Sequence, residues 1–316
     1  MQRTAEFDAF GPWIDEVTDA EGVPRLFRSH PLDLASALLT IKVPRNISRR
    51  DADPSMDLYD HLVVLDGTGV TVLSRVEEPR TRSGPVLPSS YTTQVLTWPD
   101  VAGVTVSTEF VDGLLTLYTA GRAVTVPFNG SSLPIVDRLV ALVRSRYGSG
   151  ATAAGDEGAG RRTTVAATPT ESPDVERELQ AVHRRILADE PQMRHLTTQQ
   201  RTAVRWNHPR RLVRLAKNMW PTAVQTSLAY SDGRELLVVH RRHPVVRGYK
   251  PVYSIARTAL RLDSVTGIDI ADSADLVGVR VLTVHLGDTR IELLFAAGSV
   301  APELLAARLD RVARPV

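Results

Sequence analysis

The sequence predicts an α+β fold of two similar domains, each a small antiparallel and partly closed β-barrel capped by a C-terminal helix, with extra N-terminal helices. Three observations favour this prediction: an internal repeat, short segments in which apolar and polar residues alternate, and an amphipathic helical segment at the end of each half. Such alternation is typical of antiparallel sheets with one face in water. Curling the sheet and closing one end with a helix would cover its inner face and protect its edges.

The length and charge distribution suggest where the domains begin and end. We place the first domain at residues 1–148, a flexible linker rich in Gly, Ala, Thr and Ser at 149–173, and the second domain at 174–316. Residues 1–148 carry 14 basic and 18 acidic side chains, whereas residues 174–316 carry 22 basic and 15 acidic ones. This asymmetry predicts either an anionic partner for the second domain or docking between the two domains.

The repeat is clearest between Leu115 and Val143. A strand-like run, a turn, a second run ending at Phe128 and an amphipathic helix follow one another there, and the same order returns between Leu282 and Val312. Two hairpins also repeat, around the Asp66-Gly67 and Asp232-Gly233 turns. Further strands are predicted at 91–98 and 101–106 in the first half, and at 253–262 and 265–270 in the second.

Helices are predicted in front of the strands as well. Apolar residues at helical spacing follow His30-Pro31 as far as Ile41 and follow His208-Pro209 as far as Met219, and a proline closes each segment. We expect these two helices to be equivalent. The remaining predicted helices lie at about 24–28, 174–188 and 197–206.

The composition excludes several kinds of chemistry. The chain has no cysteine, which rules out disulfides, thiolate zinc sites, iron–sulfur clusters and a cysteine nucleophile. It contains no P-loop, dinucleotide-binding or Gly-x-Ser-x-Gly motif, and His240 and His243 lack carboxylates at ligand spacing. We therefore predict no catalytic residue, no cofactor and no metal, and keep an enzyme of unrecognised type only as an alternative.

Two basic segments of the second half are the candidate binding residues. The first interleaves cations with Trp206, Leu212 and Trp220, and consists of Arg201, Arg205, Arg210, Arg211, Arg214 and Lys217. The second follows a hairpin and consists of Arg241, Arg242, Arg247 and Lys250. On a helix, the first series suits an anionic membrane surface or a nucleic-acid backbone, and the second suits a phosphate or an acidic partner. The plain alternative is a solvated helix whose apolar stripe packs on its own barrel, together with a solvated loop.

Electrostatic attraction alone cannot hold such a segment on a membrane. Each cation near an anionic leaflet contributes about 1 kcal/mol, so four contribute about 4 kcal/mol and give a roughly millimolar affinity.

A nucleic-acid function is disfavoured. Residues 196–219 have the length of a helix-turn-helix motif, with Arg210 and Arg211 at the start of its second helix. The repeat-related segment of the first half has Leu32 and Asp33 instead, and an aspartate would repel DNA. A second anion candidate, the turn Asn129-Gly130-Ser131-Ser132, is explained more simply as a helix cap.

The order of hairpin, meander and terminal amphipathic helix resembles the bacterial pleckstrin-homology-like (PH-like) and GRAM-like domains, here in tandem. The resemblance is topological and covers about residues 32–147 and 212–312. Lipid-binding members of that family carry Lys and Arg between their first two strands, a position that we assign here to the Asp66-Gly67 and Asp232-Gly233 turns. No family ligand residue is therefore carried over.

These observations lead to a functional expectation. We expect a non-enzymatic interaction or adaptor protein, in which a protein partner adds to an exposed sheet edge or lies beside a terminal helix. Peripheral binding to an anionic membrane through the basic segments of the second domain is the alternative. No signal peptide or membrane-spanning run is present, which predicts a cytoplasmic protein, or one peripheral to the inner face of the membrane.

Overall fold

The structure is a computed structural model that describes residues 4–76, 90–147, 177–248 and 252–313. Within these residues the protein is α+β, with four antiparallel sheets and few helices, and none of the sheets closes into a barrel. The predicted linker at 149–173 lies outside the described residues.

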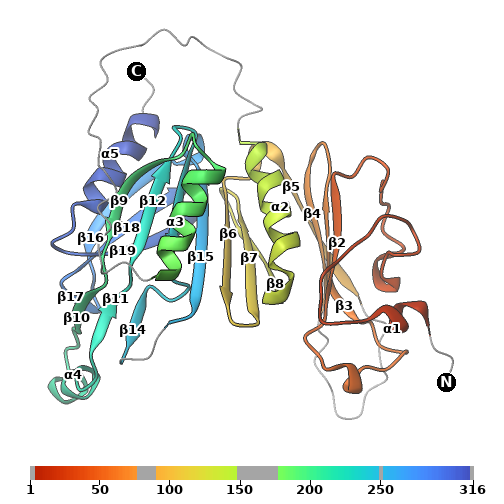
Figure 1. The fold of residues 1–316 in the computed structure, drawn as a ribbon, viewed down its shortest axis with the longest axis horizontal. Coiled ribbons are helices and arrows are strands. Elements are labelled where there is room, and N and C mark those ends of the chain that lie inside the picture. The colour runs from red at the N-terminus through yellow and green to blue at the C-terminus, as the bar shows by residue number, and fades with distance from the viewer. Residues whose placement is uncertain (1–3, 77–89, 148–176, 249–251, 314–316) are drawn as a thin grey trace, which may run out of the picture.

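A five-stranded sheet forms most of the first half, with its strands in the order β1-β2-β3-β4-β5 (Figure 1). These strands are β1 (Asp15–Glu16), β2 (Leu39–Pro44), β3 (Tyr59–Leu65), β4 (Gly69–Arg75) and β5 (Tyr91–Thr97). The turn between β3 and β4 is fixed by Asp66, whose Oδ1 accepts hydrogen bonds from the backbone N–H of Thr68 (2.6 Å) and Gly69 (3.0 Å). The predicted Asp66-Gly67 hairpin is thus confirmed.

The largest sheet contains strands from both halves. Its seven strands run in the order β8-β7-β6-β15-β13-β12-β9, and the two halves meet where β6 pairs with β15 (Figure 1). The strands are β6 (Gly103–Glu109), β7 (Asp112–Tyr118), β8 (Ala123–Asn129), β9 (Arg194–Gln199), β12 (Ser227–Ser231), β13 (Glu235–His240) and β15 (Ser254–Arg261). The β12–β13 pair confirms the second predicted hairpin.

Two smaller sheets complete the second half. One has the order β16-β18-β19, with β16 (Gly267–Asp272), β18 (Val279–Leu286) and β19 (Thr289–Ala296). The other has the order β14-β11-β10-β17, with β10 (Thr202–Trp206), β11 (Thr222–Val224), β14 (Val245–Arg247) and β17 (Leu276–Val277).

The helices differ in how much of their surface is buried. They are α1 (Ala5–Ala9), α2 (Leu133–Ser145), α3 (Arg177–Asp189), α4 (Arg211–Asn218) and α5 (Ala301–Ala313). Single 3-10 turns are found at Arg25–Phe27, Arg49–Asp51, Trp98–Asp100, Gly130–Ser132 and Leu262–Ser264. Helix α2 buries Val136, Leu139 and Val143, and α5 buries Leu305 and Leu309. The Asn129 side chain accepts a hydrogen bond from the N–H of Ser131 (3.0 Å), in the capping role expected of that turn.

Two predicted helices are wrong. The segment from Leu32 to Ile41 is a turn followed by β2. The backbone of β2 pairs with β1 and β3, and its Leu39, Ile41 and Val43 side chains are buried in the core. The segment from Thr197 to Trp206 lies in β9 and β10. In both segments the apolar spacing was compatible with a helix, and pairing with distant strands decided the conformation. The helices predicted at 174–188 and 212–219 are confirmed as α3 and α4 over their described residues.

Candidate functional site

The candidate site is a projection of the second half that carries α4. It is inserted between β9 and β12 and consists of β10, α4 and β11, with β14 and β17 paired on either side. Its small core contains Val204, Val224, Leu276 and Val279. Figure 1 shows α4 at one end of the molecule, away from the large sheet. We call this unit the α4 tip.

Polar contacts attach α4 to the strand before it. The Asn218 side chain accepts a hydrogen bond from the N–H of Trp206 (2.8 Å) and donates one to its carbonyl (3.1 Å). Lys217 Nζ lies 4.5 Å from the centre of the Trp206 ring, and Arg247 Nη2 donates to the Lys217 carbonyl (3.0 Å). The helix is therefore held in place through its polar side and its backbone.

The apolar side of α4 faces solvent. Leu212 is 81% exposed, Leu215 59%, and Met219 and Trp220, just beyond the helix, are 76% and 61% exposed. No residue of α4 is buried. A surface helix normally turns its apolar stripe toward the core, so this arrangement is reversed. Large exposed apolar patches are in general a feature of binding surfaces, which makes α4 a candidate for one.

Cations surround these apolar side chains. Residues 191–231 contain seven Lys and Arg and no Asp or Glu. On the tip, Arg205, Arg210, Arg211 and Arg214 are exposed, and Lys217 is half-buried beside Trp206. Arg247 of β14 is exposed next to them. The tip thus combines an apolar surface with a basic border.

The structure does not bring all the predicted binding residues together. Arg201 is exposed at the opposite end of β10 from α4. Arg241 is only 2% exposed, its Nη1 donates to the Ser254 carbonyl (2.7 Å), and burial lowers its pKa. As a buried side chain it cannot reach an outside partner, which corrects its place in the predicted cluster. Arg242 Nη1 donates to the Asp112 carbonyl of the first half (3.4 Å), and Lys250 lies outside the described residues.

The structure also decides between alternatives for this region. The helix-turn-helix at 196–219, which the sequence already disfavoured, is absent, because strands β9 and β10 occupy the segment of its first helix. The apolar stripe of α4, expected in the plain alternative to pack on its own barrel, is exposed instead.

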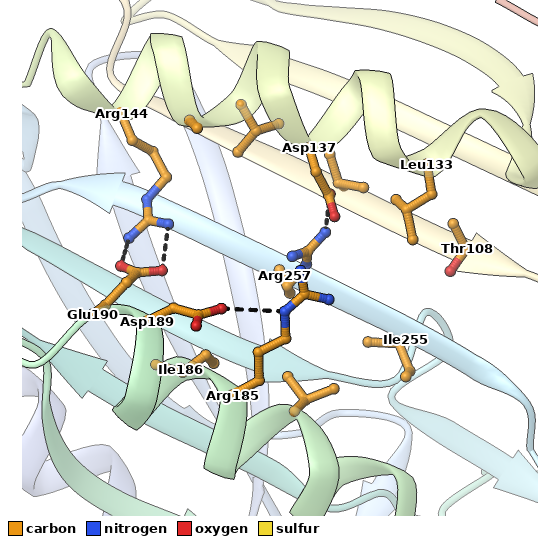
Figure 2. A pocket seen from close by; sticks show the side chains of 14 residues that line it. Thr108, Leu133, Asp137, Arg144, Arg185, Ile186, Asp189, Glu190, Ile255 and Arg257 are labelled. Atoms are coloured by element: carbon orange, nitrogen blue, oxygen red, sulfur yellow. Dashed lines mark hydrogen bonds and ion pairs between the residues drawn. The ribbon is translucent and has the colours of Figure 1, made fainter.

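A second candidate is a groove between α2 and α3, above β6 and β15 (Figure 2). Its volume is about 280 Å³. The apolar lining comes from both halves and includes Leu133, Val140, Val182 and Ile255. Sequence patterns gave no sign of this groove, since it depends on the pairing of β6 with β15.

The charged side chains of the groove pair with one another. Arg257 bonds Asp137, and Arg144 Nη1 donates to Glu190 Oε1 (3.0 Å), as Figure 2 shows. Arg144 Nε also donates to Glu235 Oε1 (3.1 Å). Burial disfavours the charged form of Arg144, but its bonds to Glu190 and Glu235 outweigh this and raise its pKa. The groove therefore has an apolar base, and the charges at its sides are paired with one another. Such a groove suits an apolar side chain more than an ion.

Over the described ranges, no three or more His, Asp or Glu side chains are grouped so as to hold a metal ion. None of the helices that the structure describes has the length and apolar character to span a bilayer. No family model matches the chain, and no curated protein or solved structure matches it either.

Proposed function

We propose that this protein binds reversibly to an anionic membrane surface through the α4 tip, and that it does so as a binding protein rather than an enzyme. The outward apolar side of α4, bordered by arginines, carries this proposal. A helix with leucines and a tryptophan on one side and cations beside them suits the boundary between lipid headgroups and acyl chains.

The apolar side chains supply the energy that the cations lack. Four cations contribute about 4 kcal/mol near an anionic leaflet. Burial of Leu212, Leu215, Met219 and Trp220 adds at least about 1.5 kcal/mol each when complete. The sum exceeds the roughly 8 kcal/mol of a micromolar complex. Because α4 is already folded and anchored by Asn218, little ordering cost is subtracted.

The proposal includes the finer fold: two similar PH-like domains, each a curved sheet covered by its last helix. Equivalent strand registers support it. Leu65 lies opposite Val70 in the β3–β4 pair, as Ser231 lies opposite Leu236 in the β12–β13 pair. The same correspondence holds for Gly103 with Tyr118 and Gly267 with His285, and for each final helix, α2 and α5.

This equivalence changes which segment of the second half corresponds to the lipid-binding loop of PH-like domains. In the second half the first two strands are β9 and β12, and the connection between them is the α4 tip. The Asp232-Gly233 turn joins the second and third strands instead. Lipid-binding PH-like domains carry Lys and Arg between their first two strands, and the tip provides them there.

Vesicle sedimentation tests the proposal. Vesicles of phosphatidylcholine with about one-third phosphatidylserine should bind the protein, and less at high salt, whereas pure phosphatidylcholine should bind it weakly. The double variant Leu212→Ser/Leu215→Ser should bind about 100-fold more weakly, since two buried leucines contribute at least about 3 kcal/mol. The double variant Arg211→Ser/Arg214→Ser should bind acidic vesicles about 30-fold more weakly, and its binding to uncharged vesicles should not change.

A matched control removes exposed apolar side chains elsewhere. Val300 and Leu304 are also exposed; Val300 lies just before α5 and Leu304 within it, and Figure 1 shows α5 well separated from α4 on the same side of the molecule. Val300→Ser/Leu304→Ser should leave vesicle binding unchanged. Equal loss in both double variants, or binding that ignores lipid charge, would refute the tip as the membrane site.

The groove favours a second candidate, an adaptor that binds a protein partner. A photoreactive residue at Ala141, an exposed groove position on α2, should crosslink another protein in cells. The same residue at Ala307, exposed on α5, serves as the control. Adducts that are identical at both positions, or that contain only this chain, would count against an adaptor role for the groove.

A further inference from the structure

We propose that copies of this chain associate head to tail, with β16 of one copy pairing with β5 of the next. The inference rests on the equivalence of the two halves proposed above, and it is independent of membrane binding. It extends to a second copy the contact that already joins the halves within one chain.

The internal junction shows the geometry. Strand β6 pairs with β15 over seven residue pairs, from Gly103 opposite Leu260 to Glu109 opposite Ser254. Beside it, the Ala120 carbonyl accepts hydrogen bonds from the N–H of Asp288 (2.6 Å) and Thr289 (3.2 Å). Gly287, at φ +61°, permits this approach, because a Cβ there would lie 2.6 Å from the Ala120 carbonyl oxygen. A strand and a turn of the first half thus fill a cleft in the second.

In the part of the chain that the structure describes, the equivalent elements β5 and β16 have no such neighbour. Among the described residues, β5 is the counterpart of β15 and borders only β4, while β16 is the counterpart of β6 and borders only β18. Val95 of β5 is 55% exposed, whereas Ala259 at the matching position of β15 is 2% exposed. One chain therefore presents both strands needed for a second junction: β5 at the edge of one sheet and β16 at the edge of another.

A cavity marks the first-half edge. It has a volume of about 310 Å³ and is lined by Val95 and Leu96 of β5 and by the turn at 119–122. In the second half, the matching space between β15 and the turn at 286–289 is filled by Gly103 and Ala120 of the first half. The corresponding residues of an incoming copy are Gly267 and Gly287, which have no bulky side chains.

The internal register predicts the register between copies. Carrying the β6–β15 pairs over to β16 and β5 places Gly267 opposite Leu96, Ile268 opposite Val95 and Asp269 opposite Gln94. The seven residues of β5, Tyr-Thr-Thr-Gln-Val-Leu-Thr, include no charge and no proline, the residues that usually protect an edge.

The second junction should be weaker than the first. The internal junction is reinforced by the Arg257–Asp137 ion pair and by Arg261, whose Nη1 donates to the Trp98 carbonyl (3.1 Å). Thr93 and Thr97 stand at the positions of these two arginines in β5. In addition, Arg122 Nη2 donates to the Val95 carbonyl (3.0 Å) and has to leave before a strand can pair there. We therefore expect association that is reversible and depends on protein concentration.

Such a contact joins two different surfaces, so it produces chains or a closed ring rather than a twofold dimer. This property separates the proposal from symmetric pairing of β5 with β5.

Cysteine crosslinking tests the register, and the natural chain has no cysteine to interfere. A full-length Gln94→Cys variant mixed with a full-length Asp269→Cys variant should form a disulfide-linked heterodimer, since opposed cross-strand residues lie within disulfide reach. Gln94→Cys mixed with Asp272→Cys, which is three residues out of register, is the matched control and should not. Equal crosslinking in both mixtures, or Gln94→Cys linking to itself, would overturn the proposal.

Sedimentation velocity tests the association. The sedimentation coefficient of the wild-type protein should rise with concentration in the micromolar range and above. Val95→Lys should abolish the rise, and Arg122→Ala should strengthen association by up to about tenfold, because it frees the Val95 carbonyl. Val111→Lys introduces the same charge at an exposed turn outside both edges and should change nothing. A wild-type protein that stays monomeric at all concentrations would refute the proposal, whatever its vesicle binding.

Discussion

Helices α2 and α4 are both amphipathic, but they face in opposite directions. Helix α2 buries Val136, Leu139 and Val143 against the sheet, and its Asp137 and Arg144 form ion pairs with the second half. Helix α4 buries no residue and turns Leu212 and Leu215 to solvent. The apolar side of α2 belongs to the folded core, whereas that of α4 is available to a partner. Substitutions should therefore affect stability at α2 and binding at α4.

The largest expected difference concerns the leucines. Leu139→Ala should lower the free energy of unfolding by about 2–5 kcal/mol, because it leaves a cavity in the core. Leu212→Ala should change it by less than about 0.5 kcal/mol, because its side chain is exposed. Urea denaturation of the two variants measures both values. A destabilisation by Leu212→Ala as large as that of Leu139→Ala would show that α4 packs inward in solution.

The next difference concerns the arginines. Arg144→Met should cost about 2–3 kcal/mol, because it leaves the buried carboxylate of Glu235 without its partner. Arg214→Met on α4 should be nearly neutral in stability and should weaken vesicle binding about fivefold. The same denaturation and sedimentation measurements apply. If Arg144→Met is neutral, the ion pairs at the junction do not hold the halves together.

A smaller effect is expected from the anchor of α4. Asn218→Ala removes two hydrogen bonds to Trp206 and should cost about 1–2 kcal/mol locally. Amide exchange should speed up in residues 207–219 and remain slow in α2. Faster exchange throughout the protein would mean that the tip is part of the global folding unit.

The smallest effect depends on pH. Burial lowers the pKa of His183 and of His195, so the folded protein prefers their neutral forms. The unfolded chain binds protons near pH 6.5. Stability should therefore be complete above about pH 6.5 and decline as the pH falls below it. Thermal denaturation at pH 7.5 and 5.5 tests this. His183→Asn/His195→Asn should reduce the difference and leave the part that comes from His61 and His240, whose pKa burial also lowers. Neither His183 nor His195 lies on the α4 tip, so vesicle binding should not follow the same curve.

Local chemistry was sufficient to predict much of the fold. The Asp66-Gly67 and Asp232-Gly233 turns and the helices α2 and α3 depend on residues close together in the chain, and they are found as predicted over the described ranges. Strand β2 was predicted as a helix, because its burial depends on β1 and β3 rather than on its own spacing. The pairing of β6 with β15, which creates the groove, leaves no local sequence pattern at all.

The candidate site was predicted only in part. The mixture of arginines with Leu212, Trp206 and Trp220 identified the region, since charge and apolar content can be read from the sequence. Periodicity shows that a helix has two sides but not which one faces inward. That choice is made by Asn218 and Lys217, whose contacts with Trp206 hold the polar side against the strand. Arg241 was wrongly assigned to the surface, because a charged side chain is usually exposed and nothing in the local sequence shows that this one is buried.

Because one sheet runs through both halves, expressing the two halves as separate fragments would expose its strands. A fragment ending after α2 would leave one edge of β6 unpaired, and a fragment beginning at α3 would leave one edge of β15 unpaired. Each fragment alone should aggregate through its unpaired strand, whereas the two fragments expressed together should associate through the β6–β15 pairing. The protein is thus suited to split-fragment complementation, with α2 and α3 as natural end points.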